Sequence, residues 1–185
     1  GQLGLSPEKG HFERVDLSNK FFWDDEHTKK LKYILNIYLD FTECKKVVDK
    51  MFMEYVSSEN DFCEDFYMDR DEVKNLATNH SIGTHSYSHI ILGKQSEQKV
   101  SEEIAKGITA LETIDQVEVR GISYPYGYRE AVPLNIEPIA QKHGLRYGFT
   151  VERSFNTTLE KELFLARADT NDMPLGKDPL IEIKN

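Results

Sequence analysis

Short apolar stretches alternate with amphipathic helical segments between residues 82 and 167, and this alternation constrains the fold more than any other feature. The expected strands cover residues 82–84, 117–124, 147–151 and 163–167, with helices over 96–114 and 135–143. Strands that alternate with helices predict βα units and a mainly parallel sheet. An open doubly wound sheet and a (β/α) barrel both fit this order. In either architecture the loops that follow the strands carry the functional site.

The stretch ahead of the first strand is predicted to be mostly helical. Apolar residues recur at helical spacing over residues 25–40 and again over 41–56, which indicates a helical pair inserted before the sheet. Residues 59–67 are expected to form a charged loop. Asp69, with Glu72 three residues later, forms a capping-box pattern at the start of another helix.

Length and composition predict one α/β domain. Residues 1–66 would hold an irregular segment and the helical pair, and residues 67–185 would hold the sheet. The net charge of −9 argues against a nucleic-acid partner, which would need a basic face. No apolar run is long enough for a transmembrane helix, and no signal peptide is visible. We therefore expect a cytoplasmic protein, and the oligomeric state stays open.

Two histidines stand four residues apart directly after the first expected strand. His85 and His89 follow the short run 81–84, in a segment that reads as the first turn of a helix or as a tight loop. Neutral imidazole is a good ligand for zinc and similar divalent ions. The pair is therefore a candidate metal site, although two surface histidines that bind no common ion would give the same short pattern.

A second motif follows the next strand. Tyr124, Pro125, Tyr126 and Gly127 end the strand and begin a loop. Because carboxyl ends of parallel strands meet at one edge of a sheet, this turn and the histidine pair are expected to share a site.

With these two motifs in this order, residues 67–167 resemble the polysaccharide deacetylase (NodB-homology) family of carbohydrate esterases. The resemblance rests on Ile-Gly-Thr-His-Ser-Tyr-Ser-His at 82–89 and on Tyr-Pro-Tyr-Gly at 124–127. It implies a distorted (β/α) barrel of the NodB-homology type, incomplete at its N-terminus and carrying the inserted helical pair.

The resemblance also implies metal-dependent hydrolysis of an N-acetyl or O-acetyl group on a saccharide. His85 and His89 match the family's metal ligands, and zinc is the expected ion. The Tyr126 N–H matches the backbone donor of the oxyanion hole. In such chemistry the ion polarises the carbonyl, a carboxylate takes a proton from water, and the N–H stabilises the oxyanion.

The family's first aspartate pair has no clear counterpart. In the family one aspartate is the base and the next is the third metal ligand, and the nearest string here ends in Asp24 and Asp25. Asp24 is therefore the candidate base and Asp25 the candidate ligand. Alternatively, both lie in the inserted helical segment and the true motif lies upstream of residue 1, in which case this chain alone is a poor catalyst.

The second half of the resemblance also departs from the family. Ser123 stands where the family has arginine, and the late histidine that serves as general acid is missing. Asp169, after the last expected strand, is the remaining catalytic candidate, although a polar loop with an Asx turn fits equally well. The candidate substrate-binding residues are Tyr87, Tyr124, Arg167 and Asp172.

Two other functions remain open. A non-catalytic barrel remnant could bind saccharide or another protein through the same cleft, as the missing aspartates would predict. A phosphatase-like or nuclease-like metal hydrolase would need acidic clusters around a second ion, and no second histidine pair or aspartate pair follows a strand.

Overall fold

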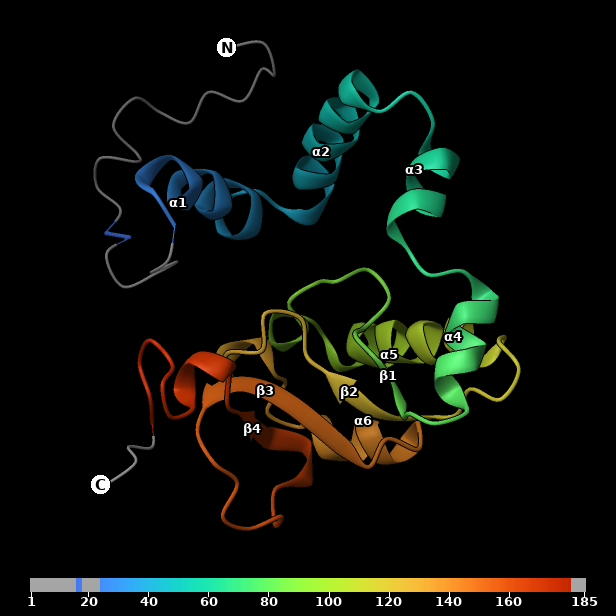
Figure 1. Ribbon diagram of the computed structural model, residues 1–185, viewed down its shortest axis with the longest axis vertical. Helices are drawn as coiled ribbons and strands as arrows, with labels where there is room; N and C mark the ends of the chain where they lie inside the picture. The colour runs from blue at the N-terminus through green and yellow to red at the C-terminus, as the bar shows by residue number, and fades with distance from the viewer. Residues whose placement is uncertain (1–15, 18–23, 181–185) are drawn as a thin grey trace. The chain divides into compact units, whose positions relative to one another are not determined.

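The strands of this protein lie side by side in one parallel sheet. The computed structural model describes residues 16–17 and 24–180, and within them the strand order is β1-β2-β3-β4 (Figure 1). The strands are β1 (Ile82–Thr84), β2 (Val119–Ser123), β3 (Tyr147–Arg153) and β4 (Leu165–Arg167). All three neighbouring pairs are parallel, as the alternation of strands and helices predicted.

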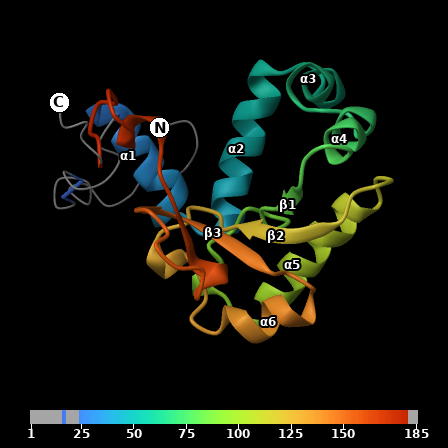
Figure 2. The ribbon, with the colours of Figure 1, turned by 60° about the horizontal axis from the view of Figure 1, so that its bottom comes forward.

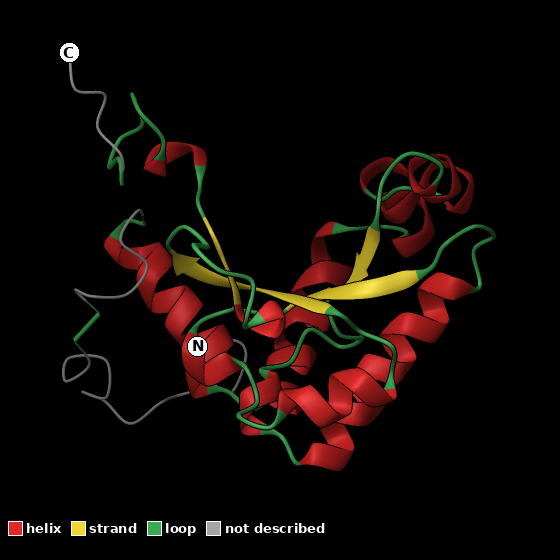
Figure 3. Ribbon diagram, turned by 90° about the horizontal axis from the view of Figure 1, so that it is seen from below, coloured by secondary structure: helices red, strands yellow, loops and turns green. Residues whose placement is uncertain are grey.

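The sheet is open in the part of the chain that the structure describes. Strands β1 and β4 form its two edges, and the strands, yellow in Figure 3, make one twisted layer. The expected α/β class and parallel sheet are thus confirmed. The closed, distorted barrel is not seen in these residues.

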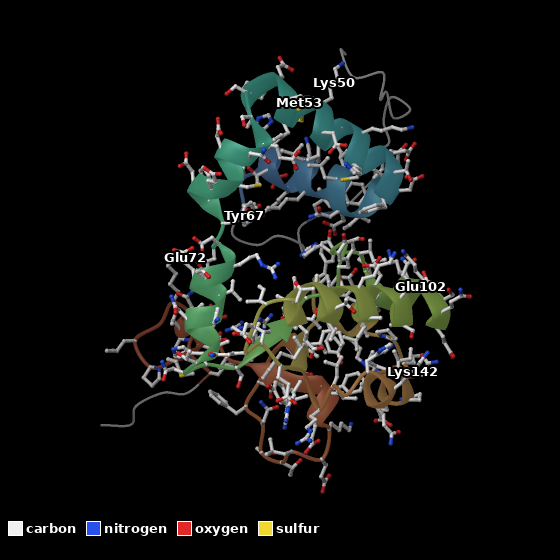
Figure 4. The ribbon with its side chains drawn as sticks, turned by 90° about the vertical axis from the view of Figure 1, so that its right-hand side faces the viewer. Lys50, Met53, Tyr67, Glu72, Glu102 and Lys142 are labelled. Atoms are coloured by element: carbon white, nitrogen blue, oxygen red, sulfur yellow. The ribbon has the colours of Figure 1, made fainter. Side chains whose placement is uncertain are left out.

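Three helices accompany the strands: α4 (Arg70–Ala77), α5 (Glu97–Glu112) and α6 (Ile136–Lys142). The expected capping box opens α4, where Asp69 accepts from the Glu72 N–H and the Glu72 side chain accepts from the Asp69 N–H (Figure 4 labels Glu72). Gly144 ends the segment after α6 with a φ of +73°, which a residue without Cβ adopts at no steric cost. Single 3₁₀ turns occupy Leu92–Lys94, Arg129–Ala131, Glu162–Phe164 and Thr170–Asp172.

The hydrophobic core lies between the sheet and the helices α5 and α6, which run along the same face of it (Figure 2). Val100, Ile104 and Ile108 recur at helical spacing on α5 and are buried, as the sequence predicted. Ile122 of β2 and Ile136 of α6 complete the centre of this cluster. The packing therefore fixes the strand ends against α5.

The chain before the sheet is helical, with one difference from expectation. The elements are α1 (Glu26–Tyr33), a π-helical turn (Ile34–Tyr38), α2 (Phe41–Tyr55) and α3 (Glu59–Phe66). The prediction of a loop over 59–67 is wrong because Ser58 caps α3 through its side chain. Phe62 and Phe66, one turn apart, stack with ring centroids 4.4 Å apart and further stabilise the helix.

The chain divides into two units, one up to Tyr67 and one from Met68. The prediction of a single domain with segments 1–66 and 67–185 stays a prediction. The sequence also predicts a short strand over 180–183, and most of this range lies outside the described residues. No helix in the described ranges is long and apolar enough to cross a membrane.

We predict that Leu92→Ala lowers the free energy of unfolding by about 2–5 kcal/mol, because Leu92 is fully buried in the core cluster and its loss leaves a cavity. Leu134→Ala is the matched control, since that leucine is 85% exposed and its truncation should cost less than about 0.5 kcal/mol. Urea denaturation measures both values. Equal effects of the two substitutions would contradict this assignment of the core.

Candidate functional site

His85 is oriented by the neighbouring strand. It follows β1, and its Nδ1 lies 2.5 Å from the backbone carbonyl oxygen of Ser123, the last residue of β2. Because a carbonyl oxygen only accepts, Nδ1 carries the proton and donates it. The lone pair of a neutral His85 is then on Nε2. Metal-binding histidines are commonly oriented in this way, through a second-shell hydrogen bond from the other ring nitrogen.

The second histidine lies beside the first. The ring centroids of His85 and His89 are 4.9 Å apart, with an angle of 63° between the planes. The segment is a tight loop, the second of the two forms expected, and the Ser86 hydroxyl accepts a hydrogen bond from the His89 N–H at 3.1 Å. Two imidazoles held this close can both contribute to one ion site.

The turn after β2 contributes a third ring. The ring of Tyr126 lies 5.2 Å from that of His89, measured between centroids. Val151 of β3 donates its N–H to the Gly127 carbonyl at 2.9 Å and so attaches the turn to the next strand. The contact between the rings of His89 and Tyr126 shows that the two motifs lie together at the carboxyl ends of the strands, as expected.

Three non-glycine residues of this site have left-handed backbone. The φ angles are +60° at Ser86, +56° at His89 and +63° at Tyr126. Such angles are disfavoured for residues with a Cβ, and they cluster where the surrounding structure imposes them, often at functional sites. The loop and the turn are therefore held in place by their contacts.

Electrostatics favour the neutral form of His89. Partial burial of its ring is the main cause that lowers its pKa, and the nearby His85 lowers it further. A lowered pKa keeps the imidazole uncharged at neutral pH. An uncharged ring has the lone pair that a metal ligand needs.

The first aspartate pair serves its own helix. The Asp25 side chain caps α1 by accepting from the His27 N–H, the Thr28 N–H and the Thr28 hydroxyl. These bonds, the hydroxyl bond first, lower the pKa of Asp25. Asp24 forms an ion pair with Lys32 at 2.6 Å. The assignment of Asp24 as base and Asp25 as metal ligand stays a prediction.

The late acidic residues form a cap at the carboxyl end of β4. Asp169 accepts from the Asn171 N–H, which is the main cause of its lowered pKa, and Asp172 accepts from the Asp169 N–H at 2.6 Å. Asp172 is 2% exposed and also pairs with Arg153. Both carboxylates thus have structural partners, as the Asx-turn alternative anticipated. Their roles in catalysis and substrate binding stay predictions.

The other substrate-binding candidates differ in exposure. Tyr87 is 61% exposed between the two histidines, so its ring is accessible to a ligand. Arg167 is exposed, and its Nε donates to the Thr150 carbonyl. The assignment of Tyr124 to substrate binding is corrected by its burial. The residue is 1% exposed, and its hydroxyl donates to the Leu163 carbonyl at 2.8 Å. A ring so buried packs in the core and has no surface for a saccharide.

The sequence reasoning missed one buried contact to the histidine loop. Glu103 of α5 is buried and accepts hydrogen bonds from Ser88, in the loop between the histidines. The available signal was a charged residue on the apolar stripe of α5, next to Ile104. Among the described residues no group of three or more His, Cys, Asp or Glu side chains is placed to hold a metal.

A hollow in the second unit lies away from the histidine pair. Its volume is about 770 Å³, and it is lined by α6 and the segment 159–163, together with Arg146 ahead of β3. These residues lie at the amino ends of β3 and β4. The histidine pair instead lies at the carboxyl ends of the strands, at the opposite end of the sheet from this hollow.

Comparisons with known proteins identify a family. The family model described as polysaccharide deacetylase matches residues 25–148, more than half of the chain. A solved structure of IcaB from Ammonifex degensii matches with 18% identity and a TM-score of 0.44, over 57% of this chain and 50% of that chain. This chain thus spans about half the length of that one. Curated proteins gave no match.

We predict that Gly107→Ala destabilises the protein, although alanine is the better helix former by about 1 kcal/mol. A Cβ at Gly107 would lie 2.5 Å from the buried Thr84 hydroxyl and 2.9 Å from the Ser86 carbonyl oxygen. Such overpacking costs about 1–3 kcal/mol, which should outweigh the gain.

The free energy of unfolding measures the outcome, and Ala110→Gly at an exposed position of α5 calibrates helix propensity in the same element. A more stable Gly107→Ala variant would show that α5 does not approach the histidine loop this closely.

Proposed function

Because the chain belongs to the polysaccharide deacetylase family, as its motifs predicted, we propose that it hydrolyses an acetyl group on a saccharide with the help of a divalent ion. The proposal covers N-acetyl and O-acetyl groups. The observation that carries it is the paired imidazoles of His85 and His89, held at the strand ends beside the Tyr126 turn. In this view the open sheet is part of the distorted barrel of that family.

The donor set fits a borderline divalent ion such as zinc. The Nδ1–H bond of His85 to Ser123 leaves the Nε2 lone pair available to an ion, and His89 would supply a second neutral imidazole. When bound, the ion would polarise the acetyl carbonyl and lower the pKa of a water molecule. Asp25 remains the candidate third ligand from this chain, and the family match begins at that residue.

The turn after β2 would supply the oxyanion donor. Pro125 has no N–H and fixes φ, so Tyr126 is the next residue of the turn with a backbone N–H. Its N–H would stabilise the negative charge on the acetyl oxygen as water adds. Asp24, the candidate base, would take the proton from that water, and the exposed Tyr87 would contact the sugar.

A second candidate is a non-catalytic saccharide-binding protein. The observation in its favour is that the Asp25 carboxylate is already engaged as the cap of α1. Both candidates predict binding of saccharide, but only the deacetylase releases acetate. Acetate release from acetylated saccharides, with and without added zinc, therefore separates them.

We predict that replacing His85 and His89 together with alanine abolishes zinc binding and acetate release, because both imidazole donors are lost. Elemental analysis after dialysis measures the zinc. His80→Ala is the matched control, since this exposed histidine of the same unit lies outside the pair. Unchanged zinc content in the double variant would contradict the site. Asp25→Asn, measured in parallel, loses zinc only if Asp25 is a ligand.

We predict that Pro125→Gly lowers turnover and leaves zinc content unchanged, because a looser backbone no longer aims the Tyr126 N–H. Loss of one oxyanion donor typically costs about 100- to 1000-fold in kcat, and a misaligned donor should approach this range. Tyr126→Phe is the control, since it keeps both the amide and the ring that contacts His89. A folded Pro125→Gly variant with full turnover would remove the turn from the mechanism.

A further inference from the structure

Glu103 is a buried acid that has no part in the proposed chemistry. It lies on α5 and is 1% exposed. Burial by itself raises the pKa of a carboxyl group, but the bonds from Ser88 and Lys99 outweigh burial and hold the pKa of Glu103 below its usual value. The side chain is therefore ionised at neutral pH. A buried charge of this kind persists only where partners satisfy it.

The main partner of Glu103 is the residue next to His89. Oε2 accepts the Ser88 backbone N–H at 2.8 Å, and Oε1 accepts the Ser88 hydroxyl at 3.1 Å. Lys99, one turn earlier on α5, pairs with Oε1 at 3.0 Å and balances the charge. Hydrogen bonds to an ionised acceptor are stronger than neutral ones. The carboxylate thus binds one loop residue through both its backbone and its side chain.

The same face of α5 also contacts the loop at its other end. Gly107 is four residues after Glu103 and so lies on the same side of the helix. Its missing Cβ leaves room for the Ser86 carbonyl, which a Cβ would approach to 2.9 Å. Helix α5 therefore fixes the loop at Ser86 through close contact and at Ser88 through Glu103.

The loop needs this support because of its backbone. Ser86 and His89 both have left-handed φ angles, and such angles persist only when surrounding contacts impose them. Within the loop, the bond from the His89 N–H to the Ser86 hydroxyl closes the turn. Glu103 provides hydrogen bonds from outside the loop to a residue between the two histidines.

We propose that Glu103 is a positioning residue for the histidine pair. By holding Ser88 it keeps the two imidazoles in contact, and it thereby sets the affinity of the pair for zinc without touching the ion. The effect on zinc rests on the proposed function, whereas the effect on the ring geometry does not.

The first experiment measures ring geometry in the metal-free protein. Nuclear Overhauser contacts between the His85 and His89 rings should be lost in Glu103→Ala. They should also be lost in Glu103→Asp, which keeps the charge opposite Lys99 but is too short to reach Ser88 and serves if the alanine variant does not fold. Glu103→Gln keeps an acceptor for the Ser88 N–H and should retain the contacts.

The neighbouring Glu102 provides the matched control. It is an exposed residue of the same helix (labelled in Figure 4), and its carboxylate accepts from Gln98. Glu102→Ala should leave the ring contacts unchanged. Ring contacts that persist in a folded Glu103→Ala or Glu103→Asp variant would overturn the proposal.

The second experiment titrates zinc alone. The Kd for zinc should rise by about 10- to 100-fold in Glu103→Ala, the usual effect of removing support from metal ligands, and by less in Glu103→Gln. Displaced rings with an unchanged Kd would overturn the proposal. If the unaltered protein binds no zinc, the proposed function fails, and the ring contacts alone then decide the role of Glu103.

Discussion

The hydrogen bond from His85 Nδ1 to the Ser123 carbonyl is the interaction on which the site depends. It forms because β1 and β2 pair in parallel with Thr84 beside Ile122, so that His85, which follows β1, lies next to Ser123. Side chains alternate between the faces of a sheet, so a slip of one residue in this register would turn His85 away. The register of two short strands thus determines which imidazole nitrogen has the lone pair.

The strained backbone around the histidines is compensated by contacts from three directions. Helix α5 holds the loop through Glu103, the Ser86 hydroxyl closes it from within, and β3 anchors the facing turn through the bond from Val151 to Gly127. Each left-handed residue costs on the order of 1–3 kcal/mol, so the arrangement requires this convergence. A rigid pair of imidazoles would lose little entropy on binding the proposed ion.

The sequence predicted those features that repeat locally. The apolar period of α5, the alternation of strands and helices, the capping box at Asp69 and the histidine motif all appear within short windows. It did not predict α3, because a serine cap and one aromatic pair are a weak local signal. The contact from Glu103 to Ser88 was also missed, since it depends on how α5 packs beneath the loop, which no window of sequence contains.

The carboxylates of this acidic chain show why residue type alone does not assign a general base. A base needs a lone pair directed at water and a pKa near the working pH. Asp25 and Asp169 instead cap helical turns, and the N–H and hydroxyl groups they bind lower the pKa of each. The Glu103 carboxylate likewise accepts hydrogen bonds from Ser88, and these bonds lower its pKa. Protonation of any of these carboxylates would weaken hydrogen bonds that hold a cap or a loop, whereas Asp24, the candidate base, is paired with Lys32.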